Sequence, residues 1–476
     1  MKFLYEPSSS GLKVEFSCTD SDKRSELVEY AKAHSDFASK CCQSFYYANL
    51  NGPSSLLVGL GECDELDLES LRNLAFSIAK KAQEHKETVI NVSLPKKFLD
   101  DASKEAYEAF AEGFMHAEYS FDDYKSEKEA PEELSIALVL GEGQKEISER
   151  GVESAKAYIE GIFLARDLVN QPSNVIYPET LAKKAQEALS PLGVDVKIYT
   201  GKELEDMGLK AYLSVAQGSD KAPHFIVMNY AGDPDSSYKT ALVGKGLTYD
   251  SGGYSLKPSN SMKTMQSDMG GSATVIGAMH AIAQKKLKVN VVAVVAACEN
   301  LLSGKAYKPG DIIGSLAGKT IEVDNTDAEG RLTLADAVYY ATHELKADRV
   351  IDLATLTGAC LIALGDEYTG LVTNNADFIQ ELKDAAQKAG EKVWELPTSK
   401  HFEKQNESKV ADIKNTGGRL AGTITAGMFV GAFVDGDKPW IHMDIAGTAW
   451  LDNAYSYLPA GGTGIHVKTL TKLFEK

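Results

Sequence analysis

The sequence contains no stretch that approaches the roughly 20 consecutive apolar residues that a membrane-spanning helix requires. The longest apolar run, Val289–Cys298, is short and rich in β-branched residues, which is typical of a buried strand. The N-terminal stretch has an early glutamate, Glu6, and lacks the apolar core of a secretory signal. These absences predict a cytoplasmic protein with no membrane partner.

Cysteine is scarce and shows no recognisable pattern. The six cysteines form no CxxC pair and have no spacing typical of a zinc site. Because we expect a cytoplasmic location, reduced thiols are the simplest interpretation. The six positions are Cys18, Cys41, Cys42, Cys63, Cys298 and Cys360.

Positive charge is in short supply as well. The chain has 50 Lys and Arg against 68 Asp and Glu, which gives a formal net charge of −18. Contacts to nucleic-acid phosphates need clustered Lys and Arg, so nucleic acid is an unlikely partner on this ground. An excess of carboxylates would instead attract metal cations.

The length and the patterning predict an α/β protein of two domains, because 476 residues exceed what one ordinary core accommodates. Short strand-like runs alternate with helical apolar spacing along the whole chain, without an internal repeat. In the first third, strands are expected at Leu12–Ser17, Ser55–Gly59, Thr88–Leu94 and Leu134–Leu140, and helices at Leu66–His85 and Ala102–His116. In the remainder, the clearest expected strands are Thr240–Val243, Val289–Ala297, Val350–Ala354 and Trp440–Ile445.

A long helix is expected between the two domains. Apolar residues recur at helical spacing over Lys145–Val169, and the pattern stops at Asn170 because Pro172 follows. The charged stretch Lys125–Glu133, which contains Pro131, predicts a surface loop before it. We therefore expect an N-terminal α/β domain over residues 1–145, a linking helix over 146–172 and a larger C-terminal domain over 173–476.

Three segments gather acidic and basic side chains beside glycines, next to predicted strands or helices. The first, Val243–Ser259, runs from an apolar strand into what we interpret as a loop of lysine, aspartate and glycine. The second, Met265–Ala273, precedes a helix, and the third, Asp324–Leu332, lies between a strand and a helix. In the third segment two acids stand two residues apart and project to one side if the backbone is extended. The four acids of interest are Asp250, Asp268, Asp327 and Glu329.

Four carboxylates in one site cannot all stay ionised without compensating charge, because like charges at close range raise one another's pKa. Two divalent cations would balance them, four charges against four. A pair of such cations can share a water, lower its pKa and polarise a carbonyl group. Ligation by oxygen without histidine suits Mn²⁺ and Mg²⁺, and Zn²⁺ also accepts carboxylates.

Structural interpretations of the same residues remain open from spacing alone. Asp268 could cap the helix that follows it, and Asp327 could cap the helix that begins near Leu332. Lys245, taken alone, reads more simply as a salt-bridge partner than as a metal ligand. The spacing therefore makes a metal site plausible without selecting it.

The segment NTDAEGRL at Asn325–Leu332 matches the signature octapeptide of the leucyl aminopeptidase family (peptidase family M17, the cytosol aminopeptidases). The segments around Asp250 and Asp268 resemble the family's metal-binding loop and its partner aspartate segment. The resemblance runs from about Ala165 to the C-terminus, whereas the N-terminal third matches only in its general α/β pattern. Further agreement lies in Ala165–Asn174, Ala354–Cys360, Val410–Phe429 and Trp440–Trp450.

The resemblance implies a fold and a set of metal ligands. It implies a smaller N-terminal α/β (macro-like) domain and a larger C-terminal α/β/α catalytic domain with a mixed, mostly parallel sheet. Two divalent ions per subunit would be bound, Mn²⁺ or Zn²⁺, with Mg²⁺ possible. Since a lysine ligand must lose its proton, binding at Lys245 should weaken as pH falls. One ion would take Lys245, Asp250, Asp268 and Glu329, and the other, more exchangeable, would take Asp250, Asp327 and Glu329.

The resemblance also implies two catalytic residues that do not bind metal. Lys257 would help to stabilise the oxyanion, because a fixed cation favours the tetrahedral intermediate over the planar carbonyl. Arg331 would hold a bicarbonate that relays protons, and the planar fork of arginine suits bidentate binding of that anion.

A substrate pocket follows from the same alignment. The family's pocket for the N-terminal side chain aligns with a thioether and three small groups, which favour an apolar residue such as leucine or methionine. Tyr249 and Tyr254 replace the phenylalanine and aliphatic residue that are commoner in the family, and we expect them to alter substrate preference or the packing behind Asp250. The aligned pocket residues are Met265, Thr355, Gly358 and Ala446.

The function implied is a metallo-aminopeptidase that acts on peptides with a free N-terminus and assembles as a homohexamer. Two alternatives compete with this function. A phosphoesterase could use the same carboxylates, but we find no basic phosphate-binding cluster beyond Lys257 and Arg331. A non-catalytic DNA-binding role, known for some members of the family, is disfavoured by the net charge of −18.

Overall fold

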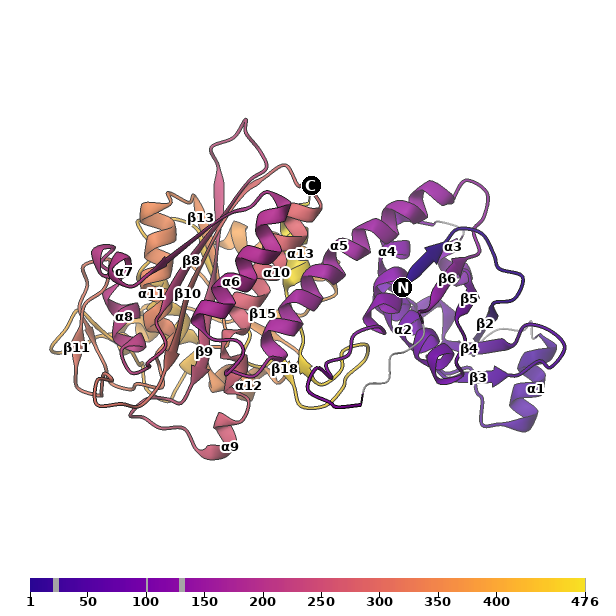
Figure 1. Ribbon diagram of the computed structural model, residues 1–476, viewed down its shortest axis with the longest axis horizontal. Helices are drawn as coiled ribbons and strands as arrows, with labels where there is room; N and C mark the ends of the chain where they lie inside the picture. Colours follow the sequence, from indigo (N-terminus) through magenta and orange to yellow (C-terminus); the bar gives the residue numbers. More distant parts are fainter. Residues whose placement is uncertain (20–24, 100–101, 128–132, 476) are drawn as a thin grey trace. The chain divides into compact units, whose positions relative to one another are not determined.

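The computed structural model describes residues 1–19, 25–99, 102–127 and 133–475 in two compact units (Figure 1). The first unit comprises Met1–Ile159 with Ala454–Pro459, and the second comprises Glu160–Asn453 with Ala460–Lys476. The division falls inside helix α5, Lys145–Asn170, which ends where the sequence predicts. Of the surface loop predicted over Lys125–Glu133, residues 128–132 lie outside the described part of the chain.

The first unit is built on a six-stranded sheet in the order β1-β6-β5-β2-β4-β3. All neighbours in it run parallel except β3 and β4, which pair antiparallel. Helices α2 and α4 pack closely against each other, and α2 begins with a capping box in which Asp67 and Ser70 bind each other's backbone N–H. The strands are β1 Lys2–Leu4, β2 Leu12–Cys18, β3 Ser44–Tyr47, β4 Ser55–Gly61, β5 Val89–Val92 and β6 Ser135–Leu138, and the helices are α1 Glu26–His34, α2 Leu68–Glu84, α3 Lys96–Leu99 and α4 Lys104–His116.

One expectation about the cysteines is wrong. Cys18 and Cys63 form a disulfide with their Cα atoms 5.6 Å apart, whereas we expected six reduced thiols. The two residues are 45 positions apart in sequence and become neighbours because Cys18 pairs with Gly61 between β2 and β4. Long-range strand pairing of this kind leaves no local spacing pattern to read. The other four cysteines are free thiols.

The second unit contains an eight-stranded sheet in the order β15-β14-β17-β13-β9-β10-β8-β7. Its four central strands, β17, β13, β9 and β10, run parallel, and the antiparallel pairs lie towards the edges. The middle of β10 is buried on both faces, which explains its continuous apolar run. The strands are β7 Asp195–Thr200, β8 His224–Ala231, β9 Lys239–Asp250, β10 Asn290–Asn300, β13 Arg349–Ala354, β14 Thr369–Thr373, β15 Val393–Glu395 and β17 Trp440–Asp444.

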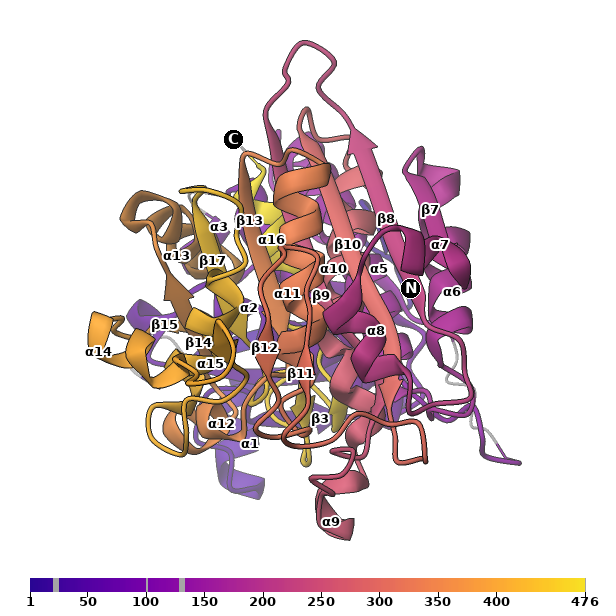
Figure 2. The same cartoon turned by 90° about the vertical axis from the view of Figure 1, so that its left-hand side faces the viewer.

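Helices cover both faces of this sheet, as the view in Figure 2 shows. Helices α6, α10, α13 and α16 form one layer, and α8, α11 and α15 form the other. The ends of helix α13 are set by single residues in the sequence. Asn375 caps its start by accepting from the Phe378 N–H at 2.9 Å, and Gly390 ends it with φ of 76°. The helices are α6 Pro178–Leu189, α7 Lys202–Asp206, α8 Lys210–Ala216, α9 Ser259–Met262, α10 Gly270–Gln284, α11 Gly330–Tyr339, α12 Gly358–Leu364, α13 Ala376–Ala389, α14 Lys400–Glu403, α15 Gly422–Gly431 and α16 Val467–Leu473.

Short elements complete the second unit. Helix α11 continues as a π-helical turn, Tyr340–Glu344. Within the described ranges, no helix combines the length and the apolar character needed to cross a membrane. The α/β fold class with mixed, mostly parallel sheets is confirmed. The remaining strands are β11 Ile312–Ile313, β12 Ile321–Glu322, β16 Ile413–Lys414, β18 Trp450–Leu451 and β19 Gly461–Gly462.

Candidate metal centre

The predicted ligand residues meet where the central parallel strands of the second unit end. Lys245 and Asp250 lie on β9, the strand between β13 and β10. Asp268 lies on a short 3₁₀ helix, Met265–Met269, directly before α10. Asp327 and Glu329 come from the turn before α11. The carboxyl ends of parallel strands in an open α/β sheet are the usual place for a ligand site.

Lys245 points its ammonium group into the acidic cluster. Its Nζ lies 2.8 Å from Asp268 Oδ1 and 2.9 Å from Glu329 Oε1, and it donates to the carbonyl oxygen of Thr355 at 3.0 Å. Only 3% of the Lys245 side chain is exposed. Thr355 also donates from its hydroxyl to Asp268 Oδ1 at 2.8 Å, which fixes the orientation of that carboxylate.

Lys257 neutralises the other side of the cluster. Its Nζ lies 2.9 Å from Asp250 Oδ2 and 2.5 Å from Asp327 Oδ1. Asp250, Asp327 and Glu329 each present a carboxylate oxygen within 4.8 Å of the others, a separation that one cation can bridge. Two lysines therefore face four carboxylates, so the cluster without cations carries an excess of negative charge.

Burial shifts the titration of these acids. Burial raises the pKa of Asp250 to about 8, and the negative charge of Glu329 adds to the effect. Burial also raises the pKa of Asp268 to about 6, although the Lys245 ammonium opposes the rise. Burial disfavours ionised Glu329 too, but Lys245 and Lys257 outweigh it and leave the pKa of Glu329 lowered. The cluster as folded thus favours bound protons or cations.

The contacts of the side chains themselves indicate that this set of donors suits divalent cations. Glu329 Oε2 is buried and has no hydrogen-bond partner among the described residues. Asp250 is held from behind, since its Oδ1 accepts from Asn300 Nδ2 at 2.7 Å and from the Gly252 N–H at 2.8 Å. The supported orientation of Asp250 and the unused oxygen of Glu329 both suit metal ligation.

Two expectations about the local backbone are wrong. Lys245 belongs to strand β9 and not to a loop, because the strand continues through Gly244 and Gly246 to Asp250. Asp327 and Glu329 do not share a side of extended backbone, since Glu329 is helical with φ of −77° and ψ of −37°. A turn brings the two carboxylates together instead.

The capping interpretation of these acids is also excluded. The N-cap residue of α10 is Met269 and that of α11 is Glu329, and neither helix start has a side-chain cap. Asp268 and Asp327 therefore do not serve the helices that follow them. Their hydrogen bonds and ion pairs are directed into the cluster.

Gly330 is required by the position of Lys245. A Cβ atom at residue 330 would lie 2.4 Å from Lys245 Cε and 2.7 Å from its Nζ. Because that lysine is buried and held by two carboxylates, it has little room to move. The absence of a side chain at Gly330 thus leaves the space that the Lys245 side chain occupies in the cluster.

Arg331 lies in the first turn of α11 beside the cluster. Its Nη1 donates to the carbonyl oxygen of Asn415 at 2.8 Å, and its buried Nε has no partner among the described residues. Burial lowers the pKa of Arg331 to about 10, so the guanidinium stays charged at neutral pH. A charged guanidinium with an unused N–H can bind a small anion.

The predicted pocket residues lie at the edge of the sheet that carries the cluster. Thr355 follows β13, Gly358 begins α12, Ala446 follows β17 and Met265 begins the 3₁₀ helix of Asp268. Asp444 Oδ1 joins the loops after β13 and β17 by accepting from the N–H groups of Leu356 and Ala446, both at 3.2 Å. Their role in binding a substrate side chain stays a prediction.

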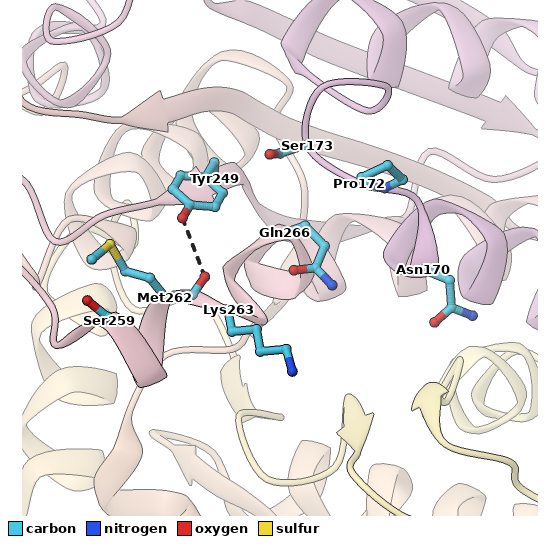
Figure 3. A pocket seen from close by; sticks show the side chains of 8 residues that line it. All are labelled: Asn170, Pro172, Ser173, Tyr249, Ser259, Met262, Lys263 and Gln266. Atoms are coloured by element: carbon cyan, nitrogen blue, oxygen red, sulfur yellow. Dashed lines mark hydrogen bonds between the residues drawn. The ribbon is translucent and has the colours of Figure 1, made fainter. Parts of the chain in front are cut away.

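Tyr249 and Tyr254 do not enter the carboxylate cluster. Tyr249 lines a neighbouring cavity of about 510 Å³ together with Met262 and Gln266, and its hydroxyl donates to the Met262 carbonyl oxygen at 3.4 Å (Figure 3). Tyr254 is exposed and donates to the carbonyl oxygen of Ser303 at 3.2 Å. Neither tyrosine changes a predicted ligand.

Three residues support the site without having been singled out in the sequence. Asn300 ends β10 and binds Asp250, Asn415 accepts from Arg331, and Asp444 ends β17 and holds the pocket loops. A polar residue at the end of a buried apolar strand was the available signal for Asn300 and Asp444. No local pattern marks Asn415. Its backbone carbonyl accepts from Arg331, and its side chain accepts from the N–H groups of Asp324 and Asn325 and donates to the carbonyl oxygens of Asn325 and Ala328.

The fold and the cluster together define an α/β metalloprotein whose ligands sit at the carboxyl ends of parallel strands. The family follows from comparison with known sequences. The model of the cytosol aminopeptidase family, catalytic domain, matches residues 163–471, and that of its N-terminal domain matches residues 15–128. The chain belongs to the cytosol aminopeptidase family, whose members are metal-dependent aminopeptidases.

Individual relatives agree with this placement. A probable cytosol aminopeptidase of Treponema denticola is 50% identical over 450 residues, covering 94% of each chain, and one of Clostridium tetani is 47% identical over 94% and 93%. Among solved structures, a mutant of tomato leucine aminopeptidase is similar with a TM-score of 0.88 and 33% identity, covering 99% and 96% of the two chains. The bottromycin maturation enzyme BotP in complex with Mn is similar with a TM-score of 0.87 and 31% identity, covering 98% and 99%.

Proposed function

We propose that this protein is a two-metal aminopeptidase that removes an apolar, leucine-like residue from the N-terminus of peptides. One observation carries the proposal: four buried or half-buried carboxylates and Lys245 converge at one edge of the sheet, and Glu329 keeps a buried oxygen unused. Relatives whose names include aminopeptidase extend over almost the whole chain, which supports the reaction class.

The residues divide into two overlapping ligand sets. Lys245, Asp250, Asp268 and Glu329 would hold one divalent ion, and Asp250, Asp327 and Glu329 the other. The metals would supply Lewis acidity and an activated water at the scissile bond. The similar enzyme BotP was solved in complex with Mn, so we propose Mn²⁺, with Zn²⁺ or Mg²⁺ as alternatives for this chain.

The remaining residues of the site would orient the substrate and move protons. Negative carboxylates would attract the free α-amine of the peptide, which restricts cleavage to the first residue. Lys257 would stabilise negative charge on the carbonyl oxygen. Arg331 would hold bicarbonate as a proton relay, and its unused Nε–H supports this role.

The substrate preference is proposed from the pocket residues. Met265, Thr355, Gly358 and Ala446 offer a thioether and small groups, a lining that suits leucine or methionine better than a charged side chain. The natural substrates would be peptides with a free N-terminus in the cytoplasm. We further propose a homohexamer, as the family resemblance implies.

Metal analysis of the purified protein tests the site directly. We expect two divalent ions per chain in the parent, and sharply fewer, with loss of peptidase activity, when Asp327→Ala and Glu329→Ala are combined. The matched control is Asp206→Ala, which removes an exposed carboxylate from α7 and should leave both metal content and activity unchanged. Full metal content in the double variant would show that the ions bind elsewhere.

A substrate comparison tests the reaction. With Mn²⁺ present, the protein should hydrolyse leucyl-p-nitroanilide and leave p-nitrophenyl phosphate intact. Leucyl substrates should be preferred to aspartyl and arginyl ones. Hydrolysis of the phosphate ester alone would identify a phosphoesterase that uses the same carboxylates.

A further inference from the structure

A pair of adjacent thiols lies in the first unit, apart from the metal centre. Cys41 and Cys42 precede β3, and their Sγ atoms are 3.7 Å apart, within hydrogen-bond distance for sulfur. Neighbouring side chains in extended backbone point to opposite faces. Here Cys42 has a left-handed backbone with φ of 59°, and the two thiols meet.

The loop that carries the thiols is fixed to the sheet on both sides. The Cys42 N–H donates to the Gly59 carbonyl oxygen at 2.9 Å, and the Gly61 N–H donates to the Ser39 carbonyl oxygen at 2.9 Å. Ser39 also has a positive φ, 59°. A left-handed conformation in a residue other than glycine is unfavourable and persists only where the surroundings impose it. The thiol pair is therefore held in place by the fold.

The two thiols differ in their exposure. Cys41 is exposed, whereas Cys42 is partly buried under the loop. A negative charge is better solvated on the exposed sulfur, so Cys42 donates and Cys41 accepts. The hydrogen bond from Cys42 lowers the pKa of the Cys41 thiol to about 7, although burial and the carboxylate of Asp67 at the start of α2 oppose it. The same bond raises the pKa of Cys42 and keeps it protonated.

We propose that Cys41 is a modification site that forms a mixed disulfide with low-molecular-mass disulfides such as glutathione disulfide. The Cys41 thiolate attacks one sulfur of glutathione disulfide, the glutathione S–S bond breaks, and a bond forms between Cys41 and that glutathione. The second glutathione leaves as a thiolate and takes up the proton that Cys41 released.

Peptide mapping of the full chain after incubation with glutathione disulfide at pH 7 tests the site. We expect one adduct at Cys41, with Cys42 unmodified and the buried Cys298 and Cys360 unreacted. The rate of Cys41 alkylation should rise with a midpoint near pH 7 in the parent protein, a measurement that needs no variant. An adduct on Cys42, or a midpoint at the ordinary cysteine value of about 8.5, would overturn the proposal.

A matched pair of variants separates the hydrogen bond from other effects. Cys42→Ala removes the donor and should slow adduct formation at pH 7 about threefold, because the fall in the thiolate fraction outweighs the greater nucleophilicity of the thiolate that remains. Cys42→Ser keeps a hydroxyl donor and should react within about twofold of the parent. Equal rates in the two variants would contradict the assignment of Cys42 as the activating group. Peptidase activity, which depends on the second unit, should be unchanged in both.

Discussion

Lys257 is distinct from the predicted metal ligands because it pairs with Asp250 and Asp327 from the rim of the cluster, with 16% of its side chain exposed. Its charge is therefore available to a substrate that approaches the site. Burial acts to lower the pKa of Lys257, but the carboxylates led by Asp250 raise it above the ordinary value. The residue is therefore cationic at neutral pH.

Lys257→Ala should lower kcat for leucyl-p-nitroanilide by about 10²–10³, the range seen when one oxyanion-stabilising donor is removed. Metal content should be unchanged, because Lys257 is not a proposed ligand. Steady-state kinetics and metal analysis check both parts, with the exposed Lys202→Ala as a matched control. A variant that keeps kcat but loses metal would assign Lys257 a role in holding the ions.

Metal binding should weaken as pH falls, because protons compete with the cation at two residues, Lys245 and Asp250. Carboxylates raise the pKa of Lys245 against the effect of burial, so at any working pH its ammonium must lose a proton to solvent when its nitrogen binds a cation. Since burial raises the pKa of Asp250 to about 8, a second proton competes with the cation below that pH. The apparent Kd for Mn²⁺ should therefore rise at least about tenfold per unit between pH 8 and pH 6.

Calorimetric titration in two buffers of different ionisation enthalpy measures the protons released. We expect more than one proton per cation below pH 8 and about one above it. A Kd that does not depend on pH would show that Lys245 stays protonated and outside the ligand set.

At the scale of elements, the site depends on how β13 and β17 end. Asp444 terminates β17, is fully buried, and connects the two strand ends. Its Oδ1 accepts from the N–H groups of Leu356 and Ala446, and its Oδ2 accepts from the Thr357 hydroxyl at 2.5 Å. One carboxylate thus holds both loops of the predicted substrate pocket.

Asp444→Ala should destabilise the second unit by about 3 kcal/mol, because it leaves buried N–H groups without acceptors. It should also raise KM for leucyl substrates more than it lowers kcat, since the loops it holds carry Thr355 and Ala446. Asp444→Asn retains an acceptor and should show smaller effects. Urea unfolding and steady-state kinetics measure the two quantities, and unchanged values in the alanine variant would remove Asp444 from this role.

At the scale of the whole molecule, the α/β class, the long helix over Lys145–Asn170 and the convergence of the acidic segments could be predicted from the sequence. The periodicity of apolar residues is local and predicts the fold class and the long helix. The convergence of the acidic segments is predicted by the family resemblance, because spacing alone does not select a metal site. The extension of β9 through Gly244 and Gly246 could not, because glycine is depleted in strands. In the structure these glycines admit close neighbours, since a Cβ at Gly244 would lie 2.6 Å from Ser272 Cα on α10.

Features that depend on distant parts of the chain were also missed. The disulfide between Cys18 and Cys63 follows from strand pairing, and the turn that joins Asp327 to Glu329 follows from the packing of α11. The support of Arg331 by Asn415 uses a backbone carbonyl, for which any residue type would serve. Such contacts are set by tertiary structure and leave no mark on composition or spacing.

The proposed hexamer is a prediction at the same scale. Sedimentation at micromolar concentration should give a mass about six times that of the 51.4 kDa chain. Activity and sedimentation measured on the same diluted samples would show whether assembly is needed for catalysis. A fully active monomer would contradict the proposed hexamer, and the family resemblance would then apply only to the fold and site of the single chain.

The short segment Ala454–Pro459 is grouped with the first unit although it lies close to the C-terminus. Its Ser456 hydroxyl donates to Asn73 on α2, and the ring of Tyr457 lies 4.7 Å from that of His116 on α4. A ribosome adds roughly 5–20 residues per second, so the stretch from Glu160 to Asn453 takes about 15 to 60 seconds to synthesise. During that time the N-terminal part of the nascent chain lacks the segment Ala454–Pro459, and chaperones can bind it.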